Sequence, residues 1–346
     1  SLVQDGQPEL TSEQTEGGWK IAVPMINIHT LGAGGGSVAH VSGGVLKVGP
    51  QSAGADPGPA CYDRGGYEPT VTDANLALGY LDPSNFLGGK TALKPDLAEE
   101  ALRKHVGEPL GLDHINASLG VHEVVSTSIA EGIRLAAVRR GTDPRRFSLM
   151  SFGGSAGLHV SKVARRLGIA QVNIPSAASV FSAYGMLSTD LQFDLSRSYP
   201  ASLQSIDLEA MRTILLELQS EGRKKLKAQQ IEPSDMTFDF SADMRYLDQI
   251  YEVNVPLPDI DLDDKTLVRQ WSASFHQRYQ ELYSYEQHQQ EIRLVTLRVK
   301  VIGKLDKVGL TPKVIQGDLD EALKGRRRIF LDKWAEAPVY EMDLLP

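Results

Sequence analysis

The chain has 346 residues, which exceeds the ~250–300 residues at which single hydrophobic cores stop growing, so two lobes are expected. It is 41% hydrophobic and 23% charged, the composition of an ordinary globular protein. The net charge of −8 argues against nucleic acid as a partner. The one basic run, "KGRRR" at 324–328, is explained at least as well by a surface loop.

Cysteine usage and hydropathy indicate the compartment. The single cysteine, Cys61, cannot form an intrachain disulfide, which favours a reducing environment. No apolar run approaches the ~20 residues that span a bilayer, and no charged-then-apolar signal peptide is visible. We therefore expect a cytoplasmic protein with no membrane partner.

The first 90 residues are rich in glycine, proline and short strand-like pieces. "SLVQDGQPEL" predicts a strand that enters an Asp5-Gly6 turn, and "WKIAVPMINIHT" predicts the strand that returns. In the run "HTLGAGGGSVAH" at 29–40, Ser37 stands where a dinucleotide fingerprint needs its third glycine. A P-loop is excluded because no Lys-Ser or Lys-Thr pair closes the run.

The segment after the glycine run reads as a hairpin and a long loop. "SVAHV" and "VLKVG" flank "SGG", which predicts two strands around a tight turn. "GPQSAGADPGPACYDRGGYEPTVTD" has too many Gly and Pro residues for regular structure. Loops of this length are usually functional or disordered, and its Cys, two Tyr and several Asp residues favour an ordered one.

An alternation of helix and strand begins near residue 96. "VHEVVSTSIAEGIRLAAVRRG" predicts a helix that ends before Gly141, with its apolar face made by Val121, Val125, Ile129, Ile133 and Ala136. "RFSLMSF", "GGSAG", "LHVSKVARRLG" and "IAQVNIP" then predict strand, turn, helix and strand. Such units build parallel sheets, which bind ligands where a strand ends and a helix begins. The turn glycines either admit a nucleotide or only let the helix pack close to the sheet.

A different unit starts near residue 193. A long amphipathic helix with Asp207 as its N-cap precedes strand material at 236–258. The next predicted helix carries an apolar stripe that is expected to lie in the core. It consists of Val268, Trp271, Phe275, Tyr279 and Leu282. The last strand is expected to alternate its apolar and polar residues. The apolar residues are Val295, Leu297, Val299 and Val301, and the polar residues between them are Thr296, Arg298 and Lys300. A smaller α+β lobe is predicted.

Residues with catalytic chemistry are scattered. The eight histidines show no H-x-H, H-E-x-x-H or C-x-x-C spacing, so no metal site is expected. His29 beside the glycine run and His159 at a helix start could converge on a site. Asp73 is a catalytic candidate that could equally cap the helix after it, and Cys61 is read as structural. No catalytic residue is assigned beyond the candidates His29 and Asp73.

Several long stretches resemble one family. "VPMINIHTLGAGGGSVAHV", "VGPQSAGADPGPACYDRGGYEPTVTDANLALGYLDP" and "RRGTDPRRFSLMSFGGSAGLHV" closely resemble the hydantoinase A/5-oxoprolinase family, as do "DMRYLDQIYEV" and "FHQRYQELYSYE". The resemblance covers nearly the whole chain. It implies an α/β protein with an actin-like (ribonuclease H-like) ATPase fold. Residues 1–192 would be the second lobe of the ATPase core with a Gly/Pro-rich loop insertion, and 193–346 the smaller α+β lobe.

The resemblance also implies a function. Family members use ATP, with Mg²⁺, to open cyclic amides such as hydantoins or 5-oxoproline, and most work with a hydantoinase B-type subunit in a hetero-oligomer. Relatives serve ketone carboxylases of the acetone or acetophenone type, so that alternative stays open, as does a non-catalytic assembly module. The cyclic amide or ketone itself is not specified by the sequence.

The resemblance places the glycine run at the cleft between lobes and makes "FGGSAG" the turn that contacts adenosine. The residues expected to bind the nucleotide are Gly32, Gly34, Gly35, Gly36, Ser37, Gly153, Gly154, Ser155 and Gly157. The alternative keeps these glycines as packing devices.

Two departures from the family matter. The Asp-Gly-Gly-Thr-type phosphate loops of the family are absent, and "SLVQDG" resembles the sequence directly after the second of them. We therefore expect a fragment of a longer protein that does not hydrolyse ATP alone. The family commonly has Asp where this chain has Asn27, which removes the acid that a metal or proton role there would need.

Overall fold

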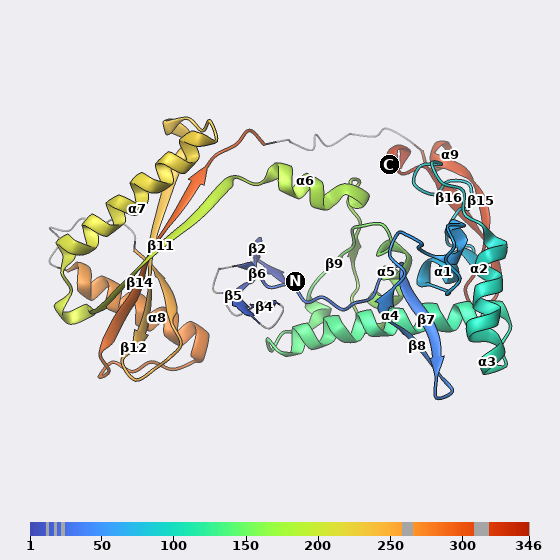
Figure 1. The fold of residues 1–346 in the computed structure, drawn as a ribbon, viewed down its shortest axis with the longest axis horizontal. Coiled ribbons are helices and arrows are strands. Elements are labelled where there is room, and N and C mark those ends of the chain that lie inside the picture. Colours follow the sequence, from blue (N-terminus) through green and yellow to red (C-terminus); the bar gives the residue numbers. More distant parts are fainter. Residues whose placement is uncertain (12–13, 17–18, 22–24, 258–265, 308–317, 346) are drawn as a thin grey trace. The chain divides into compact units, whose positions relative to one another are not determined.

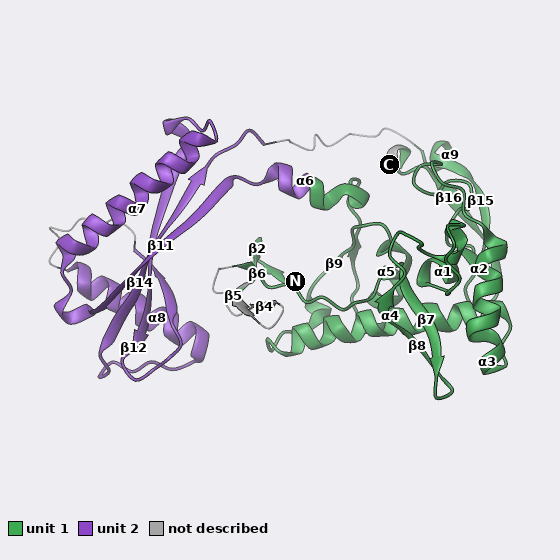
Figure 2. Ribbon diagram, viewed as in Figure 1, with its two compact units in different colours: residues 1–183, 311–346 green, residues 184–310 purple. Residues whose placement is uncertain are grey.

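The computed structural model describes residues 1–11, 14–16, 19–21, 25–257, 266–307 and 318–345. The chain forms two compact units, shown in Figure 2: Ser1–Ala183 with Thr311–Pro346, and Tyr184–Leu310. The boundary expected after residue 192 therefore differs from the observed division. The C-terminal segment, expected in the second lobe, groups with the first unit instead.

The first unit contains short hairpins, one parallel strand pair and a layer of helices (Figure 1). Its strands are β1 (Val3–Gln4), β2 (Gln7–Pro8), β3 (Leu10–Thr11), β4 (Gln14–Glu16), β5 (Trp19–Ile21), β6 (Met25–Ile26), β7 (Ser37–Ser42), β8 (Val45–Ser52), β9 (Leu149–Met150), β10 (Val172–Asn173), β15 (Leu323–Phe330) and β16 (Trp334–Tyr340). Its helices are α1 (Val71–Ala77), α2 (Pro95–Leu102), α3 (Glu108–Leu110), α4 (His114–Val138), α5 (Gly157–Leu167) and α9 (Leu319–Ala322). Helix α6 (Phe181–Ser188) spans the division between the units.

Both predicted turns are confirmed, but the strand that returns from the first turn is β2 and not the segment expected at 19–30, of which residues 22–24 lie outside the described residues. Asp5 and Gly6 adopt φ of 50° and 75° between the paired strands β1 and β2. Gly43 and Gly44 adopt φ of 59° and 75° between β7 and β8. Paired positive φ values belong to the turns whose twist matches that of a hairpin, and glycine reaches them without a steric cost.

Helix α4 organises the core of the first unit. It begins at His114, earlier than predicted, because the Asp113 side chain caps it by accepting from the Asn116 amide at 2.8 Å. Val121 and Val125 of its predicted face are buried among residues of α1, α2 and β7. Further along α4, residues around Ala130 pack against α5. Among the described residues, no helix combines the length and the apolar character needed to cross a membrane.

The hairpin of β15 and β16 docks on the segment that follows α1. The Phe330 amide donates to the Leu78 carbonyl at 2.9 Å, and the Tyr80 hydroxyl donates to the Phe330 carbonyl at 2.7 Å. The basic run 324–328 therefore lies in strand β15, which corrects the expected surface loop, although most of it remains exposed.

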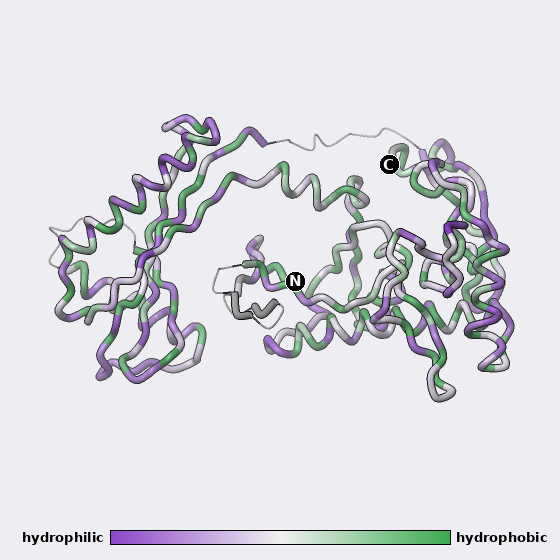
Figure 3. The backbone as a smooth tube through the Cα atoms, in the orientation of Figure 1, coloured by the Kyte–Doolittle hydropathy of each residue, from purple (hydrophilic) through white to green (hydrophobic). Residues whose placement is uncertain are grey.

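The second unit is a four-stranded antiparallel sheet in the order β11–β14–β12–β13 with two long helices. Its strands are β11 (Leu191–Ser202), β12 (Met236–Tyr246), β13 (Val253–Pro256) and β14 (Ile292–Gly303), and its helices are α7 (Leu208–Ala228) and α8 (Leu267–Tyr283). Both helices share one hydrophobic core with the sheet. Figure 3 shows polar and apolar residues alternating along α7. The predicted α+β organisation of this region is present.

Local predictions in the second unit hold in most positions. Asp207 caps α7 by accepting from the Ala210 amide at 3.0 Å. Trp271, Phe275 and Tyr279 are buried as predicted, whereas Leu282 at the end of α8 is 51% exposed. The alternation along β14 is interrupted at Val295, because an irregularity opposite Asp243 and Met244 shifts the register and buries Leu294 instead.

Candidate functional site

The predicted turn at 153–157 lies between a parallel strand and a helix. β9 pairs in parallel with β10, and the Ser151 amide continues that ladder by donating to the Asn173 carbonyl at 2.9 Å. Gly153 adopts φ of 92°, and its amide donates to the Ala178 carbonyl at 2.7 Å. Helix α5 then begins at Gly157. The strand–turn–helix–strand arrangement is therefore confirmed.

The glycine run lies directly against this turn. A Cβ placed on Gly35 would lie 3.8 Å from the Ser155 Cβ and 2.8 Å from the Thr72 Oγ1. The Gly35 carbonyl accepts hydrogen bonds of 2.9 Å from both the amide and the hydroxyl of Thr72. The glycine run, the first turn of α1 and the turn before α5 thus meet at one place in the first unit.

The glycines at this place fall into two groups. At Gly35 and Gly36 a Cβ would lie 2.8 Å from a side-chain oxygen, of Thr72 and Ser52 respectively, so these two positions are closely packed. At the other four positions an added Cβ would have no neighbouring atom within 4 Å. These positions are Gly34, Gly153, Gly154 and Gly157. The backbone of this second group borders open space, which is where a bound molecule could approach it.

Gly32 and Ser37 shape the glycine run. Gly32 adopts φ of 59°, whereas Gly34, Gly35 and Gly36 do not have positive φ. The Ser37 side chain is buried; its Oγ accepts from the Gly34 amide at 3.0 Å and donates to the Gly32 carbonyl at 3.4 Å. These bonds close a tight turn, so Ser37 holds the loop conformation from within.

A buried polar network lies behind the turn. His159 in the first turn of α5 stacks on His122 of α4, with ring centroids 4.4 Å apart. Asn75 bridges the pair, with its Oδ1 2.9 Å from His122 Nδ1 and its Nδ2 3.5 Å from His159 Nε2. Ser126 Oγ lies 3.0 Å from His159 Nδ1 and donates to the His122 carbonyl at 2.7 Å. The network links α1, α4 and α5.

Burial keeps both imidazoles neutral. It lowers the pKa of His122 to about 3, with the neighbouring His159 and Lys162 acting in the same direction. Burial, together with Lys162, lowers the pKa of His159 to about 4. Neutral rings fit one consistent order of donors: His122 Nδ1–H to Asn75, Asn75 to His159 Nε2, and His159 Nδ1–H to Ser126. The network therefore fixes the start of α5 through hydrogen bonds without buried charge.

Asp73, a catalytic candidate, is fully buried and bonded to the backbone. Its carboxylate accepts from the amides of Cys61 and Thr70 at 2.8 Å each and from the Ala60 amide at 3.3 Å. It also closes a capping box with Thr70 at the start of α1. Asp73 was predicted either as a catalytic residue or as a helix cap, and these contacts match the cap. They anchor the long loop to α1. Cys61 beside it is buried, and burial, then Asp73, raises the pKa of its thiol.

His29, the other candidate, does not meet His159. It is exposed, and its Nε2 lies 3.4 Å from Nη2 of Arg140, which also pairs with Glu9. Asn27 donates to the Glu9 carboxylate at 3.4 Å. The Asn27 side chain thus belongs to a polar group around Arg140. The expected convergence of His29 and His159 is not observed.

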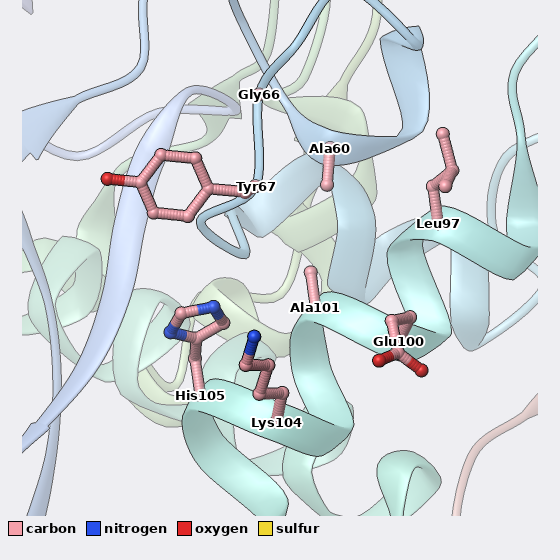
Figure 4. A pocket seen from close by; sticks show the side chains of 8 residues that line it. All are labelled: Ala60, Gly66, Tyr67, Leu97, Glu100, Ala101, Lys104 and His105. Atoms are coloured by element: carbon pink, nitrogen blue, oxygen red, sulfur yellow. The ribbon is translucent and has the colours of Figure 1, made fainter.

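A hollow of about 350 Å³ lies elsewhere in the first unit (Figure 4). Lys104 and His105 reach it from η2, a π-helical segment (Arg103–Gly107) that continues α2, and Tyr67 faces them from the long loop. The sequence analysis did not predict this hollow, because it depends on how the loop folds over α2.

Sequence analysis also missed His122 and Asn75. Asn75 and His122 are separated by 47 positions, and Asn75 and His159 by 84. Contacts between elements so far apart in the chain leave no local spacing to detect. One local signal was available: His122 directly follows Val121, the first residue of the predicted apolar face.

Comparison with known proteins identifies the family. The Hydantoinase/oxoprolinase family matches residues 1–195, and the Hydantoinase/oxoprolinase C-terminal domain matches residues 202–346. The chain therefore belongs to the hydantoinase/oxoprolinase family.

Two relatives and one solved structure illustrate the likeness. The chain is 38% identical to caprolactamase subunit alpha of Pseudomonas jessenii, over 99% of this chain and 50% of that one. It is 30% identical to the acetophenone carboxylase gamma subunit of Aromatoleum aromaticum, over 94% and 46%. The crystal structure of ATP-dependent caprolactamase from P. jessenii superposes with a TM-score of 0.73, covering 96% of this chain and 49% of that one. The chain thus has this family's fold and spans about half the length of these relatives.

Proposed function

We propose that this chain is part of an ATP-dependent hydrolase subunit that opens a cyclic amide. The observation that supports this most is the 38% identity to a caprolactamase subunit over 99% of the chain. A lactam carbonyl is a poor electrophile because its nitrogen donates electron density. ATP would transfer a phosphoryl group to the lactam oxygen, which makes the carbon electrophilic. Water would then add to that carbon and the ring C–N bond would break, with the nitrogen taking up a proton. A second water would hydrolyse the resulting acyl phosphate to the carboxylate and inorganic phosphate.

The residues around the α5 turn fit one side of a nucleotide. Gly34, Gly153 and Gly154 present backbone next to open space, and Ser155 stands at the meeting point of the two loops. The amides of Leu158, His159 and Val160 donate to the carbonyls of Ser155 and Ala156, so this turn would act on a ligand through the positive end of the α5 dipole, which favours anionic or polar groups. We assign the adenosine side of an actin-like ATPase site to this surface, with Gly32 and Ser37 shaping its edge.

The phosphate-holding groups and Mg²⁺ are proposed to lie outside this chain, which contains no Asp-Gly-Gly-Thr loop. This chain alone is therefore expected not to hydrolyse ATP. Among its own residues, exposed His29 beside Arg140 remains the candidate for contact with substrate. The intact protein is proposed to act in the cytoplasm with a hydantoinase B-type subunit, as a hetero-oligomer.

A second function has specific support. The 30% identity to an acetophenone carboxylase subunit over 94% of the chain favours activation of a ketone or bicarbonate on the same scaffold. Both functions need ATP to activate a weak electrophile or nucleophile, so the nucleotide surface would serve either.

Turnover by the intact complex distinguishes the two proposals. The complex should be given ATP with caprolactam, hydantoin, 5-oxoproline, acetone or acetophenone, each with and without bicarbonate, while phosphate and organic product are measured. Bicarbonate-independent ring opening supports the hydrolase, and bicarbonate-dependent carboxylation of a ketone supports the alternative. Phosphate release that no substrate stimulates contradicts both.

A further inference from the structure

A histidine-rich cluster lies in the second unit, apart from the nucleotide surface. His276 belongs to α8, and Glu286 and His288 belong to the segment that joins α8 to β14. One ligand atom from each of the three side chains lies within 4.8 Å of the other two. The His276 and His288 rings are 4.4 Å apart between centroids.

His276 is held in a defined orientation. Its side chain is buried, and its Nδ1 lies 2.8 Å from the Tyr246 hydroxyl on β12. With Nδ1 engaged, Nε2 is the nitrogen left to bind a ligand. Histidines that bind metals are usually oriented by such a hydrogen bond from their other nitrogen.

The same tyrosine holds the loop. The amide of Gln287, which stands between the other two members of the cluster, donates to the Tyr246 hydroxyl at 2.8 Å. Glu286 and His288 are therefore presented from a backbone fixed at its middle residue. One hydroxyl positions both sides of the cluster.

Glu286 and His288 are already paired, and both side chains are exposed to solvent, which leaves them room to rotate toward an ion. His288 Nε2 lies 2.8 Å from Glu286 Oε1, and their side chains are 67% and 32% exposed. Zinc bonds of ~2.0–2.2 Å to nitrogen and oxygen require ligand atoms closer together than 4.8 Å. Rotation of the two exposed side chains toward the fixed His276 supplies that closure.

We propose that His276, Glu286 and His288 form a binding site for a divalent transition-metal ion of the Zn²⁺ class. Two imidazoles and one carboxylate favour Zn²⁺ over Mg²⁺ or Ca²⁺, which prefer ligand sets made of oxygen alone. Three protein ligands leave a position for water. The bound ion would tie the 284–291 segment to α8. The sequence predicts no metal site here because these three residues share no recognised spacing.

Zinc titration of the 346-residue chain, without an affinity tag and after treatment with chelator, tests the site. Calorimetry should detect one high-affinity Zn²⁺ per chain, and Zn²⁺ should raise the Tm. Glu286→Gln and His288→Ala should each weaken Zn²⁺ affinity by at least about tenfold and abolish the rise in Tm. His114→Ala is the matched control, because His114 also faces a carboxylate, Glu99 at 3.9 Å, but belongs to a two-residue pair. It should leave both readouts unchanged.

The visible spectrum of the Co²⁺-loaded chain gives an independent readout. An absorption band typical of low coordination number should appear in the native chain and in His114→Ala, and disappear in the two site variants. The proposal is overturned if the native chain binds Zn²⁺ no more tightly than the site variants. It is also overturned if His114→Ala loses as much affinity as they do. If His288→Ala fails to fold by circular dichroism, Glu286→Gln, which preserves side-chain shape, decides the outcome.

Discussion

Gly34 and Gly35 are neighbours in the chain, yet an added methyl group would have different consequences at the two positions. At Gly35 it would lie 2.8 Å from the Thr72 Oγ1, which is held by its bond to the Gly35 carbonyl. At Gly34 it would meet nothing within 4 Å. Close packing against Thr72 therefore disfavours a side chain at Gly35. At Gly34 the space beside the backbone is open, so a side chain there would occupy room that a ligand could use.

Gly35→Ala should lower the free energy of unfolding by about 1–3 kcal/mol, because Thr72 must move and its hydrogen bond weakens. Gly34→Ala should change stability little but should weaken ATP binding by the intact protein, since its methyl group occupies the open space. Urea unfolding and nucleotide titration of both variants measure the two effects. Equal stability losses at the two positions would contradict the packing distinction.

Asp73 provides a second test at the level of single residues. Asp73→Asn replaces one carboxylate oxygen by an NH2 group, which cannot accept a hydrogen bond. With the NH2 group at the Oδ1 position the Cys61 amide loses its acceptor, and at the Oδ2 position the Thr70 and Ala60 amides lose theirs. The buried donors left unpaired should lower the free energy of unfolding by about 2–4 kcal/mol. Asp113→Asn, at the exposed N-cap of α4, should cost less than about 1 kcal/mol, because asparagine caps well. A smaller loss at Asp73 than at Asp113, in urea unfolding, would argue against the structural role.

At the level of elements, the stacked pair of His122 and His159 joins α4 to α5 and makes stability depend on pH. The folded pKa values, about 3 and about 4, lie below the ordinary value of 6.5. Below pH 6.5 the unfolded chain binds protons that the folded chain does not, so the stabilisation present above that pH declines as the pH falls toward 4. Each ring adds a slope of up to about 1.4 kcal/mol per pH unit.

His159→Gln should flatten this slope between pH 6.5 and 4.5 by up to about 1.4 kcal/mol per pH unit, because one of the two titrating groups is gone. Urea unfolding at several pH values gives the slope directly, whatever stability the substitution itself removes. An identical slope in His159→Gln and the native chain would contradict the assignment.

Local elements were predictable because their signals are local. The β9–turn–α5–β10 unit, the hairpin at Gly43 and Gly44, and the cap at Asp207 each follow from residues adjacent in the chain. Leu294 was missed because the register shift depends on the strand that pairs with β14. The polar network behind α5 was missed for the same reason, since Asn75 binds partners on two distant helices.

At the level of the whole chain, residues 318–345 belong with the first unit through contacts that no local pattern predicts. Tyr80 and Phe330 are separated by 250 positions, and Arg327 reaches both the Tyr80 carbonyl and the Asp82 carboxylate. Gly79 makes this approach possible. It adopts φ of 77°, and a Cβ there would lie only 2.2 Å from the Arg328 carbonyl oxygen.

Gly79→Ala should therefore displace the β15–β16 hairpin. A methyl group cannot fit against a backbone oxygen at that distance, so the bond from the Phe330 amide to Leu78 should open. Gly89→Ala is the matched control: Gly89 has nearly the same φ, 80°, but its nearest atom would be 3.8 Å away. Both variants carry the backbone strain of about 1–2 kcal/mol, and only Gly79→Ala adds the collision. Hydrogen exchange should show fast exchange of the Phe330 amide in Gly79→Ala and slow exchange in Gly89→Ala. A Phe330 amide that stays protected in Gly79→Ala would mean that its bond to Leu78 survives, which would contradict the predicted displacement of the hairpin.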